Sequence, residues 1–183
     1  MSLRQPTLRP HVMTTQEMLD HFALQRLVVT YCHGIDRGDL ALVRSLYHDD
    51  AIDDHSPMFV GSADEYVAWL PGMLANWSAT AHIIHSSLFL IDGDNAEGES
   101  TLTAYHRTRD NKREIIAYGR YIDQCHKREG VWRFYRRSLA LDWSEERDAP
   151  QTAGIGEGAA MGQPSDQDPV YTRLPLFRRQ RGG

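Results

Sequence analysis

The sequence predicts an α+β domain in which three N-terminal helices cover the concave face of a curved antiparallel sheet. Helical periodicity dominates the first half of the chain, whereas four long strand-like segments follow Asn76. Helices grouped first and strands grouped afterwards are typical of this fold class. With 183 residues, 41% of them hydrophobic, and no repeat at a fixed period, the chain fits one domain with a substantial core.

The first predicted helix has a clear start. Thr14 and Glu17 form a capping box, and the apolar residues that follow recur at helical spacing to about residue 34. Phe22 and Val29 lie off this apolar stripe. We therefore expect the helix to be buried on more than one side.

Two shorter helices follow. Gly34 and Gly38 are expected to end the first helix, and Asp39 to cap a second that runs to about residue 47. A capping box at residues 62–65 starts a third helix, which we expect to kink or stop near Pro71 because proline lacks the backbone N–H.

The second half of the chain predicts an antiparallel meander. Its strands are TAHIIHSSLFLI, AEGESTLTAYHRT, IIAYGRYIDQCH and VWRFYRRSLALDW, separated by the turns DGDN, RDNKRE and KREG. A short hairpin at about residues 51–60 is expected at its edge. Around this domain of residues 14–145 we place an N-terminal arm, residues 1–13, and a C-terminal tail, residues 146–183, that docks on a neighbouring subunit.

Charge and composition argue against two classes of partner. The net charge of −5 is spread along the chain, and the one basic cluster is RRQR near the C-terminus. Nucleic-acid binding needs a basic stripe, so no nucleic acid is expected. No apolar run reaches the length of a membrane span and the first residues lack a secretory apolar region, so we expect a cytoplasmic protein without membrane contact.

A helix that crosses a curved sheet leaves an apolar cavity suited to a small ligand. Tyr31 continues the inward stripe of the first helix and Asp36 lies just beyond it, so both reach one end of this cavity. On the strand that begins near Thr80, alternation puts His82 and His85 on opposite faces. One histidine therefore faces the cavity unless a bulge intervenes, and alternation alone does not decide which.

An ordered series of short motifs extends over about residues 15 to 145. It comprises the first capping box, Y-x4-D, GDL, YHDDA, AH, IDGDNA, GRYID and GVWRFYRRS. In this order they resemble the SnoaL-like group of the nuclear transport factor 2-like superfamily, which includes scytalone dehydratase, bile-acid 7α-dehydratase and polyketide cyclases. The resemblance implies a cone-shaped α+β barrel and, in several members, an acid/base site that needs no cofactor.

The resemblance also assigns site residues. In the bile-acid dehydratase pattern, the tyrosine and aspartate of Y-x4-D and a histidine ten residues before the aspartate of IDGD are catalytic. These correspond to Tyr31, Asp36 and His82, and a second histidine of the pattern corresponds to His85. The carboxylate that the pattern places on the next strand is missing, since the nearest positions are Tyr105 and His106.

These residue types suit proton transfer at carbon. We expect His82 to act as the base, Asp36 to orient it and Tyr31 to donate a hydrogen bond to the oxygen that gains charge. The lower-ranked pocket residues are His85, Tyr47, Asp54 and Tyr105.

The predicted function is a lyase or isomerase of the dehydratase or cyclase type that acts on a small, hydrophobic, cyclic, oxygenated substrate without a cofactor. One alternative is hydrolysis or dehalogenation at the same site. Another is a non-catalytic ligand-binding or assembly module, like the β subunit of a ring-hydroxylating dioxygenase.

Other histidines and acidic residues are given plainer roles. His33, His48 and His55 are expected to be solvated. The run YHDDAIDDH lacks the spacing of a metal site and is expected to span a helix end and a strand, so no metal is predicted. Large side chains on the last strand favour a homotrimer or homodimer formed through the convex face.

Overall fold

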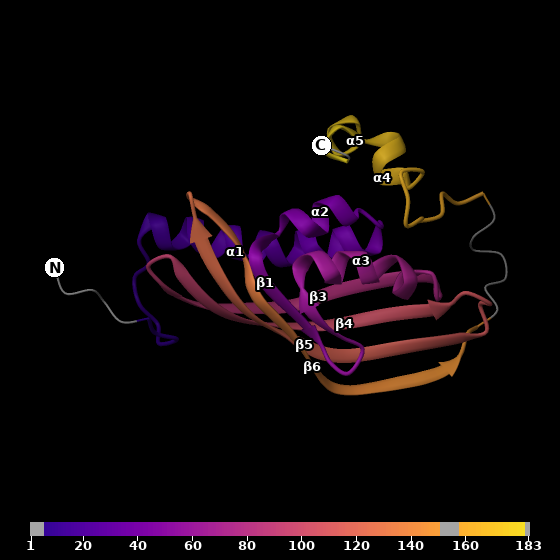
Figure 1. Ribbon diagram of the computed structural model, residues 1–183, viewed down its shortest axis with the longest axis horizontal. Coiled ribbons are helices and arrows are strands. Elements are labelled where there is room, and N and C mark those ends of the chain that lie inside the picture. The colour runs from indigo at the N-terminus through magenta and orange to yellow at the C-terminus, as the bar shows by residue number, and fades with distance from the viewer. Residues whose placement is uncertain (1–5, 151–157, 182–183) are drawn as a thin grey trace.

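The computed structural model describes residues 6–150 and 158–181. Its helices are α1 (Thr15–Asp36), α2 (Leu40–Ser45), α3 (Ala63–Leu74), α4 (Pro169–Arg173) and α5 (Pro175–Gln180). Its strands are β1 (Tyr47–His55), β2 (Phe59–Ser62), β3 (Trp77–Asp92), β4 (Asn95–Thr108), β5 (Arg113–Arg128) and β6 (Val131–Asp148). Helices α1, α2 and α3 lie together on one side of the curved sheet, which confirms the predicted α+β fold (Figure 1).

The six strands form one open sheet in the order β2-β1-β6-β5-β4-β3. The meander from β3 to β6 is antiparallel, as predicted, but β1 pairs in parallel with β6. The chain turns from α2 directly into a strand at Tyr47. The hairpin of β1 and β2 is for this reason longer than predicted. The run YHDDAIDDH is wholly β1 and includes no helix end.

Both capping boxes form. The Thr14 hydroxyl accepts a hydrogen bond from the Glu17 amide at 3.2 Å, and the Glu17 carboxylate accepts one from the Thr14 amide at 2.6 Å. The Ser62 and Glu65 pair repeats this arrangement at α3. Each pair satisfies N–H groups that the first helical turn leaves unpaired, which is why the starts were predictable.

The helix ends differ from the predictions. Helix α1 continues through Gly34, where a side chain would collide with Val43 of α2, and it ends before Gly38, whose φ is +61°. Helix α3 runs one turn beyond Pro71 without stopping. Phe22 and Val29 are 64% and 56% exposed. Within the single chain, helix α1 is therefore buried on one of its faces and not on several.

The core lies between α1, α3 and the inner face of the sheet. Buried tyrosines are prominent in it: Tyr31, Tyr47, Tyr66 and Tyr121. In the described ranges, no helix combines the length and the apolar character that crossing a bilayer requires.

The described part of the C-terminal tail packs on the end of α1 in its own chain. The Tyr171 hydroxyl lies 3.1 Å from His33 Nε2, and Arg181 donates hydrogen bonds to the carbonyls of Arg37 and Gly38. Arg37 also pairs with Asp168 at 3.4 Å. Docking of the tail on a neighbouring subunit stays a prediction.

Candidate active site

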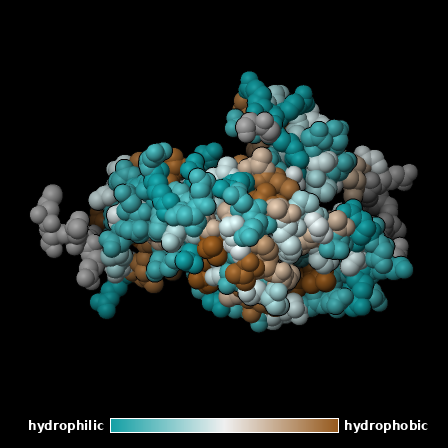
Figure 2. All heavy atoms as spheres, viewed as in Figure 1, coloured by the Kyte–Doolittle hydropathy of each residue, from teal (hydrophilic) through white to brown (hydrophobic). Residues whose placement is uncertain are grey.

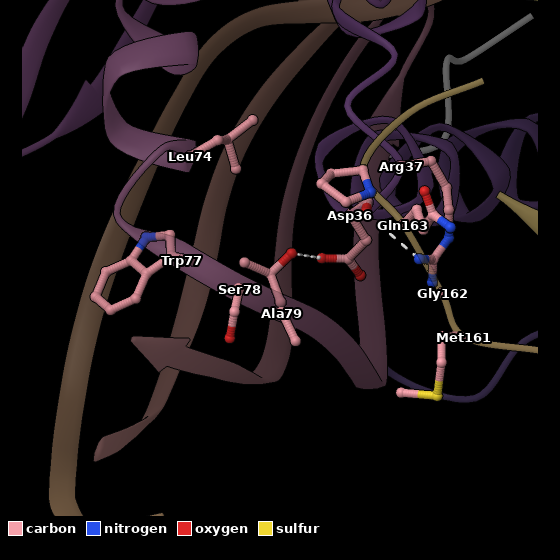
Figure 3. A pocket seen from close by; sticks show the side chains of 11 residues that line it. Asp36, Arg37, Leu74, Trp77, Ser78, Ala79, Met161, Gly162 and Gln163 are labelled. Atoms are coloured by element: carbon pink, nitrogen blue, oxygen red, sulfur yellow. Dashed lines mark hydrogen bonds between the residues drawn. The ribbon is translucent and has the colours of Figure 1, made fainter. Parts of the chain in front are cut away.

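A pocket of about 230 Å³ opens where α1 ends, beside the start of β3. The end of α3 and a segment of the C-terminal tail complete its wall. The lining residues are Asp36, Arg37, Leu74, Trp77, Ser78, Ala79, Thr80, Met161, Gly162, Gln163 and Pro164. Figure 3 shows Asp36 between Ala79 of β3 and the tail residues Gly162 and Gln163.

Asp36, the last residue of α1, is held by three hydrogen bonds from β3. Its carboxylate accepts from the Thr80 hydroxyl at 2.9 Å, from the His82 amide at 2.8 Å and from His82 Nδ1 at 2.7 Å. Burial alone raises the pKa of this carboxyl, but these hydrogen bonds and the charge of His82 lower it below its ordinary value overall. Asp36 is therefore an ionised, fixed acceptor at neutral pH.

The contact with Asp36 determines how His82 is protonated. An ionised carboxylate can only accept, so Nδ1 of His82 donates to Asp36, and in the neutral ring the lone pair is on Nε2. The two side chains are only 9% and 10% exposed. Nε2 makes no hydrogen bond to any residue that the structure describes. It is also not one of the fully buried side-chain polar atoms that lack a partner. Nε2 is thus the ring nitrogen of His82 that is not engaged by another residue of the described ranges.

His106 adds a second imidazole that the sequence analysis did not assign. It lies opposite Thr80 in the β3–β4 register, and its ring meets the ring of His82 edge-on at 5.5 Å. Burial and the neighbouring His82 lower the pKa of His106 to about 4, against the opposing charge of Asp36. Alternation along β4 could have revealed it, since His106 shares the face of buried Leu102 and Ala104.

Tyr31 lies in the packed core and not beside the Asp36–His82 pair. Its hydroxyl is 2.5 Å from the hydroxyl of Tyr66, and the residue is 1% exposed. Burial, with the nearby charge of Asp53, raises the pKa of Tyr31 far above its ordinary value. The structure therefore unites two of the three predicted catalytic residues, and gives Tyr31 a partner from α3.

A second carboxylate–imidazole pair lies on the inner face of β1. Asp53 accepts a hydrogen bond from the Tyr47 hydroxyl at 2.7 Å and another from His55 Nδ1 at 2.5 Å. Tyr47 is accordingly buried in this network and does not line the mouth of the pocket. His55 is 7% exposed and stacks on Tyr66, which corrects the expectation that it is solvated.

Two other histidines expected in solvent are also packed. His48 is buried, and its Nε2 lies 2.9 Å from the carbonyl oxygen of His126. His33 is partly buried against the tail residue Tyr171. Both corrections arise from contacts between distant parts of the chain, which residue type alone does not indicate.

Three of the lower-ranked residues lie away from the pocket. His85 bonds to Thr103 on the convex face. The bulge between Ile84 and Ser86 is at His85 itself, so alternation is unbroken from His82 to Ile84 and leaves His85 on the outer face. Tyr105 is on the same outer face and donates to Glu114. Asp54 points away from the buried side chains that flank it on β1 and accepts hydrogen bonds from Ser56.

A buried ion pair lies beneath Tyr31. Arg137 of β6 and Asp123 of β5 form two hydrogen bonds of 2.8 Å, and both side chains are fully buried. The guanidinium also packs against the rings of Tyr31, Tyr121 and Phe134. Its Nη1 has no partner among the described residues.

The described ranges contain no group of three or more His, Cys, Asp or Glu side chains arranged to hold a metal ion. That the protein acts without a cofactor stays a prediction.

The SnoaL-like domain matches residues 16–138. The chain belongs to the SnoaL-like family. The match includes Tyr31, Asp36, His82 and His106, whereas the tail segment that lines the pocket lies outside it.

Solved structures with the same SnoaL-like fold include several enzymes. A protein provisionally assigned as a scytalone dehydratase, from Novosphingobium aromaticivorans, is 24% identical, with a TM-score of 0.68 over 79% of this chain and 98% of that one. A hexachlorocyclohexane dehydrochlorinase of type 2 is 16% identical, with a TM-score of 0.70 over 76% and 96%.

A third structure points to a different activity. A provisionally assigned aromatic ring hydroxylase from N. aromaticivorans is 21% identical, with a TM-score of 0.64 over 72% and 94%. No curated protein matches the chain. At these identities the solved structures establish the fold of this SnoaL-like protein.

Proposed function

We propose that this SnoaL-like protein is a lyase or isomerase that moves a proton at carbon without a cofactor. The observation that carries the proposal is the contact between Asp36 and His82, two largely buried side chains that meet 2.7 Å apart beside a pocket that Asp36 lines. A carboxylate that fixes an imidazole tautomer is the arrangement that general-base catalysis requires.

In the proposed reaction, Nε2 of His82 removes a proton from a carbon next to a carbonyl group or next to a carbon that bears a leaving group. Asp36 stabilises the imidazolium that forms, and its three hydrogen bonds keep it in place during the transfer. A positioned base of this kind contributes about 10²- to 10⁴-fold in rate. His106 stays neutral near pH 7 and so adds no competing positive charge beside His82.

The pocket supports a small, cyclic, oxygenated substrate. Its volume of about 230 Å³ suits a molecule of one or two rings. Leu74, Trp77 and Met161 supply apolar wall, and Gln163 supplies an amide that can bond to oxygen. The names of two similar structures, a dehydratase and a dehydrochlorinase, both describe eliminations, and this favours lyase chemistry.

Proton exchange in D₂O tests this proposal before the natural substrate is known. Cyclic hydroxyketones, enols and halides are incubated with the protein, and NMR follows deuterium uptake or elimination. We expect one compound class to react, and His82→Gln to slow it by about 10²-fold or more. His85→Gln is the matched control, because His85 is on the same strand but on the convex face. Full activity of His82→Gln would refute the proposal.

The non-catalytic alternative has one specific observation in its favour. Aromatic side chains around Tyr31 pack against one another in the part of the cone bounded by β1, β5 and β6, and none of them lines the pocket beside Asp36. If the protein is an assembly module, compounds of the panel will bind or fail to bind without any exchange, and His82→Gln will change neither result.

A further inference from the structure

Tyr121 differs from the other buried tyrosines on the inner face of the cone. The hydroxyls of Tyr31 and Tyr66 bond to each other, and that of Tyr47 bonds to Asp53. The hydroxyl of Tyr121 has no hydrogen-bond partner among the described residues, although Tyr121 is only 2% exposed. A buried hydroxyl without a partner is costly, so it calls for an explanation.

This hydroxyl is not sealed inside packed side chains. In the described ranges, the fully buried side-chain polar atoms that lack a partner are Arg107 Nε and Arg137 Nη1, and Tyr121 Oη is not among them. The remaining exposed surface of Tyr121 therefore includes its oxygen. A molecule that entered the cone could reach it.

The register of the sheet puts Tyr121 on the same inner surface as the His82 side chain. His82 lies opposite Ala104, which lies opposite Ala117 of β5, and Tyr121 is four residues further along β5. Gly119 lies between Ala117 and Tyr121 on this face. Small residues, Ala104, Ala117 and Gly119, therefore lie on the surface of the sheet between the imidazole and the phenol.

The packing around Tyr121 fixes its ring and leaves its hydroxyl protonated. The Arg137 guanidinium lies 4.1 Å from the ring centroid, and the rings of Tyr31 and His55 meet it edge-on. Burial raises the pKa of Tyr121 well above its ordinary value, with further contributions from Tyr31, Cys32 and, more weakly, Asp36. The group is a neutral donor at neutral pH, and it lies close enough to Asp36 to feel its charge.

We propose that Tyr121 donates a hydrogen bond to an oxygen of the ligand whose carbon-bound proton His82 removes. This inference rests on the proposed function and deepens it, because it requires a substrate with a carbonyl or enol oxygen. A donor aimed at that oxygen stabilises the negative charge that develops as the proton leaves. From the sequence, Tyr31 was expected in this role, but its hydroxyl is already engaged by Tyr66.

Two measurements on the full-length protein test the proposal. The first compares exchange or turnover of the best panel compound by the wild type, Tyr121→Phe and Tyr118→Phe. Tyr118 is the matched control, since it lies on the convex face of the same strand, against Trp143. We expect Tyr121→Phe to lower kcat about 10- to 100-fold while its melting temperature is unchanged, because no hydrogen bond within the protein is lost.

The second measurement does not depend on catalysis. Binding of 4-nitrophenol, a small ring with an enolate-like oxygen, is followed by its absorbance. We expect Tyr121→Phe to weaken binding about fivefold or more relative to the wild type and Tyr118→Phe. If the wild type shows no exchange but this binding difference holds, the proposed function fails, and only the hydrogen bond from Tyr121 to a bound oxygen stands.

Three results would overturn the inference. One is a Tyr121→Phe protein with unchanged turnover and unchanged 4-nitrophenol affinity. Another is a larger loss of kcat in Tyr31→Phe than in Tyr121→Phe, which would return the role to Tyr31. The third is a wild type that does not bind 4-nitrophenol at millimolar concentration.

Discussion

At the scale of single residues, Asp36 is in a position that is unfavourable for a negative charge. It is a carboxylate at the C-terminal end of α1, where the helix dipole disfavours negative charge. Three hydrogen bonds from Thr80 and His82 offset this penalty and fix the orientation of both oxygens. The same contacts that stabilise the charge also prepare His82 to accept a proton.

Asp36→Asn tests this double role. An amide presents an NH₂ group where two acceptor oxygens are needed, so His82 loses its fixed tautomer and its amide loses a charged acceptor. We expect proton exchange to fall at least about 10²-fold and the free energy of unfolding to fall by about 1–3 kcal/mol. Calorimetry and the NMR exchange assay measure the two effects. Thr80→Val, which removes one donor, should show smaller changes, and equal losses in the two variants would contradict this account.

His106 predicts a pH dependence of stability. Its pKa is about 4 in the folded protein and 6.5 as an ordinary histidine, so the unfolded chain binds more protons between these values. Its contribution is complete above about pH 6.5 and is lost as the pH falls towards 4, by at most about 3 kcal/mol. Chemical denaturation at several pH values measures this loss.

His106→Gln should flatten the stability profile between pH 6.5 and 4. The lowered pKa of Asp36 gives stability that is lost only below its ordinary value of 3.8, so the two residues act in different ranges. An unchanged slope in His106→Gln would show that another group causes the loss.

Sequence reasoning found the pair at the site but not its surroundings. Asp36 and His82 were named by the resemblance to the SnoaL-like family, whereas strand alternation alone did not decide between His82 and His85. The partner of Tyr31, Tyr66, comes from another helix, and the free hydroxyl of Tyr121 is recognisable only once every neighbouring hydroxyl has been paired. Such features depend on contacts between distant segments, which spacing does not record.

At the scale of elements, the short helix α4 secures one wall of the pocket. Asp168 caps it, accepts hydrogen bonds of 2.8 Å from the amides of Gln163 and Val170, and is 4% exposed. Because Gln163 lines the pocket, Asp168 links the cap of α4 to the wall of the pocket.

Asp168→Ala should release this wall. Loss of a capping side chain costs about 1 kcal/mol, and here the Arg37 contact is lost as well. We expect faster amide hydrogen exchange at Gln163 and Val170, with little change in the strands of the sheet. Asp168→Asn keeps an acceptor oxygen and should lie between the wild type and Asp168→Ala. Unchanged exchange at both amides would contradict the role of the cap.

Local signals predicted the elements better than their connections. The capping boxes located α1 and α3, and turn residues such as Asp, Gly and Asn located the ends of the four long strands. The parallel pairing of β1 with β6 was missed, because no local pattern indicates which distant strand completes an edge. The two register shifts in β3 were equally invisible in its alternation.

At the scale of the whole molecule, apolar residues remain exposed on the convex face of the sheet. Ile83, Thr103, Tyr118 and Trp143 form one row across β3 to β6, and Ile83 and Trp143 are 51% and 54% exposed. Figure 2 shows apolar residues among the polar ones over the strand region of the face in view. We propose that the convex face forms the contact of a homotrimer or homodimer.

Sedimentation velocity at micromolar concentration tests this assembly. The wild type should sediment as a dimer or trimer, and the double variant Ile83→Lys, Trp143→Lys as a monomer, because two lysines cannot be buried there without partners. Phe22→Lys, on the exposed side of α1, is the control and should leave the assembly unchanged. A monomeric wild type would contradict the proposal.

The parallel pairing of β1 with β6 also constrains how the chain is made. Tyr47 emerges from the ribosome long before its neighbour Phe134, so β1 and β2 must wait, with one edge unpaired, until synthesis of the last long strand. Nascent chains that stop short of β6 should therefore recruit chaperones, because a waiting strand edge invites pairing with other polypeptides.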